Sequence, residues 1–272
     1  MINRQATGIV SIAVVLVAAA VGVLGYRHLM TIPLERVVVS GNEHAAEADL
    51  IALAELDTSR TLYRIDAELT ADRVARHPWV ETAGVLRLPT GTMRIRIDER
   101  RPVVQVLDWE GRVAWYLDRT GAMMPVTARG GVTIETDTTR GEPEIVPHHF
   151  DVPVLSGLRD EYHPMHTVSS EPLRAFLDVL ADVPDETGRK ISEVILVRTA
   201  HSEDIQVRLV PTEKRPGVRV RLGSEEFEDR IRSMEAFWNQ QIVRNPDVRY
   251  ELIDLRFDGR IVSRQARDVL TP

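Results

Sequence analysis

Residues 77–100 read HPWVETAGVLRLPTGTMRIRIDER, and this stretch decides the fold of the first globular part of the chain. Residues 80–88 and 92–99 each have the composition of a β-strand, and Pro89-Thr90-Gly91 between them is typical of a turn. In the second strand, apolar and polar side chains alternate, with Met93, Ile95 and Ile97 on one side and Arg94, Arg96 and Asp98 on the other. This period of two predicts an antiparallel hairpin with one buried face. Trp79, which precedes the hairpin, is expected to pack in the core.

Upstream of this hairpin, the sequence predicts one strand and two helices. Residues 36–39 are one arginine and three β-branched valines, which predict a strand, and the turn signal Ser40-Gly41-Asn42 ends it. Residues 45–56 have apolar side chains at spacings of three and four, which predicts a helix with one buried face. A second helix is expected to start at Asp66, its N-cap, and to continue until Pro78 ends it. The predicted order is therefore β-α-α-β-β.

The chain begins with an apolar run that is long enough to cross a membrane. Residues 5–26 contain no charged side chain, and residues 8–27 form the predicted span. As a helix rising about 1.5 Å per residue, this run matches a hydrocarbon layer of roughly 30 Å. The alternative is a cleaved signal peptide, because the small residues 18–20 resemble a cleavage site. Flanking charges do not decide the orientation. Because a large region follows a single span, we expect residues 1–7 in the cytoplasm and residues 28–272 outside it.

The remainder of the chain predicts a β-rich domain with flanking helices. One helix is expected at residues 171–183 with Ser170 as its N-cap, and another after Ser224, also as an N-cap. We interpret the apolar stripe of the second helix as core packing; it consists of Phe227, Ile231, Met234, Trp238 and Ile242. The expected strands are residues 103–106, 113–117, 191–198, 205–210, 218–222 and 250–264. Residues 127–147, rich in Gly, Thr and Pro, are expected to form a long loop.

Composition and motifs argue against catalysis and against nucleic-acid binding. A net charge of −7 and a pI of 5.7 leave no basic surface for a phosphate backbone. The chain has no cysteine, which excludes disulfides, thiol nucleophiles and Cys-ligated zinc. The sequence contains no His-Glu-x-x-His, no G-x-S-x-G and no phosphate-binding loop. We therefore expect a protein that is not an enzyme and that binds no metal, cofactor, small-molecule ligand or nucleic acid.

Several motifs, which follow one another in order after the single span, resemble those of the FtsQ/DivIB family of bacterial cell-division proteins. They are Val38-Val39-Ser40-Gly41-Asn42, Pro78-Trp79-Val80, Glu99-Arg100-Arg101-Pro102, Leu117-Asp118-Arg119-Thr120-Gly121, residues 152–157 and residues 250–264. The resemblance implies an α+β chain with one transmembrane helix, a POTRA domain over residues 33–102 and an FtsQ-type, mixed or antiparallel β-domain over residues 103–272. It also implies a single-pass scaffold at the division septum. The POTRA domain and the membrane helix would contact other division proteins.

The resemblance assigns partner binding to the last predicted strand, residues 250–264, which lies at a sheet edge in this family. There it accepts a strand from FtsB (DivIC), itself paired with FtsL, by β-augmentation. The partner-binding residues that it implies are Arg198, Arg256, Phe257, Asp258, Gly259, Arg260, Ile261, Val262, Ser263 and Arg264. Phe257 stands where the family usually has tyrosine, and a residue usual between Asp258 and Gly259 is missing. The alternative is that Asp258-Gly259 closes an ordinary hairpin.

Two other classes of protein stay open as alternatives. POTRA domains also occur in envelope adaptors of outer-membrane assembly or secretion, where a long run of amphipathic membrane strands follows them. Here predicted helices interrupt the strands. A secreted hydrolase would require signal cleavage after Ala20 and a catalytic motif. The family resemblance implies instead a non-catalytic scaffold that links early division proteins to septal peptidoglycan synthesis.

Overall fold

The structure is a computed structural model that describes residues 4–126, 149–211, 217–245, 247–257 and 259–266. Helix α1, Arg4–Leu29, contains the predicted apolar span. Its segment Ile12–Leu29 is long and apolar enough to cross a membrane, and none of that segment is buried within the protein. The loop expected at residues 127–147 lies outside the described residues. The described residues up to Glu99 form one compact unit, the first unit, and those from Arg100 onward form another, the second unit.

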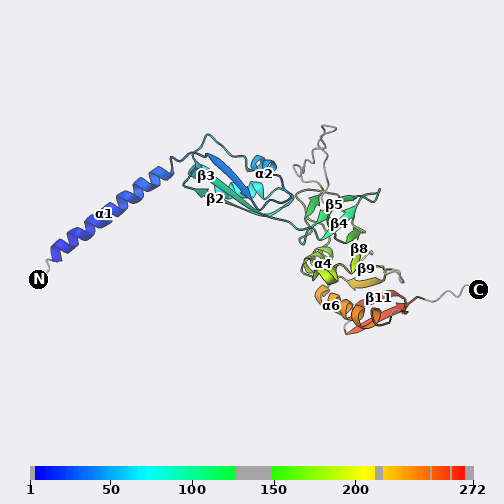
Figure 1. Ribbon diagram of the computed structural model, residues 1–272. Coiled ribbons are helices and arrows are strands. Elements are labelled where there is room, and N and C mark those ends of the chain that lie inside the picture. Colours follow the sequence, from blue (N-terminus) through cyan, green and yellow to red (C-terminus); the bar gives the residue numbers. More distant parts are fainter. Residues whose placement is uncertain (1–3, 127–148, 212–216, 246, 258, 267–272) are drawn as a thin grey trace, which may run out of the picture. The chain divides into compact units, whose positions relative to one another are not determined.

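The first unit has the predicted β-α-α-β-β order (Figure 1). Its elements are β1 (Arg36–Ser40), α2 (Glu47–Ala54), a short 3₁₀ turn (Leu62–Arg64), α3 (Ala67–Val74), β2 (Val80–Leu88) and β3 (Thr92–Glu99). The β2–β3 hairpin has the predicted bounds, and β1 pairs with β3 in parallel, so the sheet order is β1-β3-β2. Helix α2 is shorter than predicted because Glu55, with φ 46°, turns the chain out of the helix.

The core of the first unit follows the apolar periodicity of the sequence. Met93, Ile95 and Ile97 are buried on one face of β3, and Trp79 is fully buried. Helix α3 begins at the predicted N-cap, where the Asp66 carboxylate accepts hydrogen bonds from the backbone N–H groups of Glu68 and Leu69. These features confirm the predicted hairpin and its buried face.

Glu99, the last residue of β3, ties the sheet to the turn that leads into α2. Its carboxylate accepts backbone N–H bonds from Glu43 (2.9 Å), His44 (2.9 Å) and Ala45 (2.8 Å), and the His44 Nδ1 atom lies 2.8 Å away. The His44 ring stacks on buried Trp79, with 5.1 Å between ring centroids. Ala46, the N-cap of α2, has no side-chain acceptor of its own, and the N–H groups that Glu99 binds belong to the turn just before it.

The described strands of the second unit form one mixed sheet in the order β12-β11-β10-β9-β8-β7-β4-β5-β6. They are β4 (Val104–Leu107), β5 (Val113–Leu117), β6 (Met123–Pro125), β7 (Val154–Ser156), β8 (Ile191–Arg198), β9 (Glu203–Leu209), β10 (Arg219–Gly223), β11 (Tyr250–Phe257) and β12 (Arg260–Gln265). The pairs β4–β7, β7–β8 and β10–β11 are parallel, and the other pairs are antiparallel. The expected mixed β-domain is confirmed.

Helix α4 (Glu171–Ala181) packs against β9 in the second unit. The predicted N-cap Ser170 accepts a hydrogen bond from the Leu173 backbone N–H at 3.3 Å. The face that packs on the sheet is apolar and buried; it consists of Leu173, Phe176, Leu177 and Leu180. A short helix, α5 (Asp185–Gly188), follows, which no sequence pattern predicted.

Helix α6 (Phe227–Phe237) packs against β10 and β11, and it begins later than predicted. Its N-cap is Glu226 and not Ser224, because Gly223 (φ 82°) and Glu226 (φ 56°) both turn the backbone before the helix starts. A π-helical turn, Trp238–Ile242, continues the helix. The predicted stripe is buried except at Trp238, which is half-buried, so its interpretation as core packing is confirmed.

Candidate partner-binding edge

Strand β12 is the end strand of the second unit's sheet. It pairs with β11 on one side only, and all six of its residues are exposed. The backbone N–H and C=O groups along its other side therefore face no described strand. An exposed strand edge of this kind can pair with a strand from another chain.

The predicted single strand at residues 250–264 is wrong, because the chain folds back within it. Phe257 pairs with Arg260, so the chain reverses over the two residues between them. Gly259 has φ 65°, a backbone conformation that favours glycine. Asp258, one of the predicted partner-binding residues, lies outside the described residues. The alternative expectation, a hairpin, is the observed structure, and the edge belongs to β12.

The hairpin exposes apolar side chains beside this edge. Phe257 is 51% exposed, Ile261 42% and Val262 52%. Arg260 and Val262 point to one face of β12, whereas Ile261 and Ser263 point to the other, because side chains alternate along a strand. Apolar surface is therefore available on both faces of the edge.

A charged cluster fixes Arg256 at the end of β11. The Arg256 guanidinium donates to Asp254 through Nε (2.9 Å) and Nη2 (2.8 Å), and its Nη1 atom lies 3.4 Å from the Asp204 carboxylate. The hydrogen bonds from Arg256 hold the pKa of Asp254 below its ordinary value, although burial opposes this shift. The positive charge of nearby Arg221 also lowers the pKa of Asp254. The bond to Asp254 raises the pKa of Arg256. Each guanidinium nitrogen of Arg256 thus makes one contact with the described residues, and among these the second N–H of each Nη atom is left for a partner.

Arg198 lies at the same end of the sheet as Arg256 but not beside it. It ends β8, and β9 and β10 separate that strand from β11. Three interstrand spacings of about 4.8 Å place the two backbones about 14 Å apart. The Nε atom of Arg198 bonds to Glu203 at 2.5 Å. A partner that contacts both arginines must extend along the end of the sheet.

Of the residues around Arg256, the sequence pattern indicates Asp254 alone. Asp254 stands two positions before Arg256 on one strand, so the period of two already placed both on one face. Asp204, which contacts Arg256, and Arg221, which contacts Asp254, come from β9 and β10, and no local pattern identifies them. Among the described residues, no group of three Asp, Glu or His side chains is arranged to hold a metal ion.

Comparison with known proteins gives matches to two family models along the chain. Residues 32–100 match the POTRA domain, FtsQ-type, and residues 109–256 match the C-terminal domain of cell division protein FtsQ/DivIB. The predicted partner-binding residues from Phe257 to Arg264 follow the second match.

Curated relatives named cell division protein FtsQ are similar over most of the chain. The protein from Rhodothermus marinus is 40% identical over 237 residues, which cover 87% of this chain and 79% of that relative. The protein from Salinibacter ruber is 31% identical over 247 residues, which cover 90% of this chain and 87% of the relative. Together with the apolar helix α1, these matches show that the chain belongs to the FtsQ/DivIB family of membrane-anchored bacterial cell-division proteins.

Proposed function

We propose that this protein is a non-catalytic scaffold of the divisome that binds FtsB by accepting an additional strand at β12. The observation that carries the proposal is the one-sided pairing of β12. An added strand satisfies the free backbone groups and covers apolar side chains such as Phe257 and Val262. FtsL would join through its pairing with FtsB, as the family resemblance implies.

The anchor and its orientation belong to the same proposal. Helix α1 stays attached as a single-pass anchor, with residues 1–7 in the cytoplasm and both folded units outside it, at the division septum. The first unit and α1 contact other division proteins. In this way the protein links early division proteins to the complex that synthesises septal peptidoglycan. The apolar composition of α1 and the family membership support this arrangement.

Phe257→Glu tests the proposed binding edge. Phe257 is exposed beside the hairpin turn, so the charge costs little in the free protein but removes an aromatic anchor in the complex. We expect affinity for the FtsB/FtsL ectodomains to fall by about 2 kcal/mol, which is roughly 30-fold in Kd. Biolayer interferometry with the full-length chain in nanodiscs measures this change. The intact mass of the chain shows at the same time whether residues 1–29 are retained.

Trp109→Glu is the matched control, since Trp109 is an exposed aromatic residue (89%) in the turn between β4 and β5. It should bind FtsB/FtsL as the wild type does. Undiminished binding by Phe257→Glu, or an equal loss in both variants, would overturn the assignment of β12 as the binding edge.

A further inference from the structure

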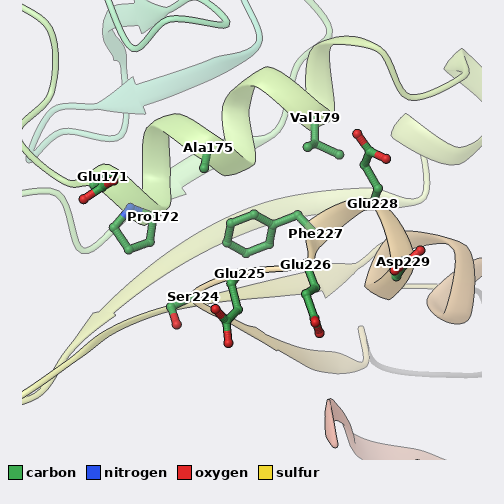
Figure 2. A pocket seen from close by; sticks show the side chains of 10 residues that line it. All are labelled: Glu171, Pro172, Ala175, Val179, Ser224, Glu225, Glu226, Phe227, Glu228 and Asp229. Atoms are coloured by element: carbon green, nitrogen blue, oxygen red, sulfur yellow. The ribbon is translucent and has the colours of Figure 1, made fainter. Parts of the chain in front are cut away.

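A groove runs between α4 and the start of α6 in the second unit (Figure 2). It has a volume of about 600 Å³. A second hollow of about 280 Å³ continues it along α4, because Val179 and Glu228 line both. None of the lining residues belongs to β11 or β12, so the groove is separate from the proposed binding edge.

The floor of the groove is apolar. Pro172, Ala175 and Val179 follow one another at spacings of three and four along α4, on a different face from the buried core residues of that helix. Phe227 lies opposite them, with its ring beneath Ala175 (Figure 2). Ala175 is exposed and Pro172 and Val179 are half-buried, so the α4 side of the floor offers apolar contact to a ligand, while Phe227, only 3% exposed, stays part of the core.

The rim of the groove is acidic. Five carboxylates line the larger hollow, and no basic residue does; they belong to Glu171, Glu225, Glu226, Glu228 and Asp229. Glu226 pairs with Arg230 and Asp229 with Arg232. Within the described part of the chain, Glu171, Glu225 and Glu228 have no ion-pair partner.

The stabilisation of helix N-termini explains only some of the acidic residues on this rim. An acidic residue in the first turn of a helix is stabilised by the helix dipole, and Glu171 and Glu228 occupy such positions. The continuation of the groove adds Asp178 and Asp182, both bridged by Arg119, and Glu235, which lies 3.6 Å from Lys190; Arg232 also lines it. The excess of negative charge surrounds an apolar floor, which is the surface that a basic, partly apolar ligand complements.

We propose that this α4–α6 groove docks a basic protein segment, in which Lys or Arg residues flank a bulky apolar side chain. The aliphatic stems of Lys and Arg can lie on Ala175 and Val179 while their charged ends reach the carboxylates of Glu171 and Glu228. The carboxylates are spread along the rim and do not converge, which favours an extended polycation over a single metal ion. The partner is a protein other than the strand donor at β12, and the groove makes the second unit a two-site scaffold.

Synthetic peptides test the groove directly. The probe is fluorescein-labelled Lys-Arg-Lys-Leu-Leu-Lys-Arg-Lys, and a second peptide carries Gly in place of both Leu residues. Fluorescence anisotropy with the full-length chain in nanodiscs of neutral lipid measures both affinities. We expect the Leu peptide to bind at least 10-fold more tightly than the Gly peptide. The double variant Glu171→Lys/Glu228→Lys should weaken the Leu peptide at least 10-fold, and Ala175→Trp should abolish the preference for Leu.

The matched control is Glu47→Lys/Glu68→Lys, which changes the net charge equally and also removes first-turn carboxylates, but from α2 and α3. It should leave peptide binding unchanged. Equal weakening in both double variants would mean attraction by net charge alone, and equal affinity for the two peptides would mean that the floor takes no part; either result overturns the proposal. Because FtsB/FtsL binding by Glu171→Lys/Glu228→Lys should stay at the wild-type level, failure here is distinguishable from failure of the β12 assignment.

Discussion

At the scale of single residues, Glu99 shows how one side chain joins two elements that are far apart in sequence. Its carboxylate is almost buried and accepts three backbone N–H bonds in the turn before α2. Burial alone would raise the pKa of Glu99, but the hydrogen bonds from Ala45, His44 and Glu43 outweigh it and hold the pKa below its ordinary value. The charged carboxylate is therefore a stabilising part of the first unit.

Glu99→Gln should lower the free energy of unfolding by about 1–3 kcal/mol at pH 7, because an amide replaces a charged acceptor and turns an NH₂ group toward N–H donors. The folded-state pKa lies below the unfolded-state value, so the contribution of Glu99 is complete above the unfolded-state value, near 4.5. It is lost as the pH falls through the folded-state value. Urea unfolding of both proteins between pH 7 and pH 3 should show their difference shrinking in acid.

Glu81→Gln provides the comparison for this measurement, since Glu81 is exposed on β2 and has no ion pair among the described residues. Its effect should stay within about 0.5 kcal/mol. A difference between wild type and Glu99→Gln that stays constant from neutral to acidic pH would contradict the assigned role of the carboxylate.

At the scale of secondary-structure elements, local patterns predicted strands better than turns. The bounds of β2, β3 and β8 match the prediction, because alternation and flanking Pro, Gly or Asn residues are all local signals. The N-cap of α6 was mispredicted because serine is a common cap, whereas the backbone positions of Gly223 and Glu226 decide where the helix begins. The strand β6 and the helix α5 are too short to give a periodic pattern.

The hairpin at residues 250–265 illustrates the same limit. Its sequence has strand character on both sides of Asp258-Gly259, and this dipeptide is the single local signal that one strand ends and another begins. Family resemblance placed partner binding there but did not separate β11 from β12. The sequence also did not predict that Asp204 contacts Arg256 or that Arg221 contacts Asp254, since strands that meet in the sheet are distant in the chain.

Proline substitution should map the open side of β12. Successive N–H groups along a strand point to opposite sides, so of Ile261 and Val262 one donates toward β11 and the other outward. Proline removes the donor. We expect one of Ile261→Pro and Val262→Pro to keep the hairpin but to lose FtsB/FtsL binding, and the other to disrupt the hairpin. Hydrogen exchange of β11 and binding measurements distinguish the two outcomes.

Ile261→Thr and Val262→Thr keep the N–H group and strand preference, and they serve as controls that should retain at least partial binding. Retained binding in both proline variants would show that the partner does not pair with the backbone of β12.

At the scale of the whole molecule, the chain has two compact units, with Gly41 in the first and β12 in the second. Gly41 has φ 90°, and a Cβ atom there would overlap the carbonyl oxygen of Ile97. Gly41→Ala should therefore destabilise the first unit by at least about 2 kcal/mol. Hydrogen exchange should show lost protection in β1–β3 and unchanged protection in β11, with normal FtsB/FtsL binding. Lost protection in both units would show that they unfold together.

The exposed edge of β12 also carries a risk of self-association. Two copies of β12 that paired antiparallel about Val262 would place Arg260 of one copy opposite Arg264 of the other, and this would occur twice. Like charges directly opposite each other destabilise a strand pair. Charged residues on an open edge are a common protection against aggregation. The two arginines thus disfavour this homodimer register while the edge stays accessible to a strand of different charge.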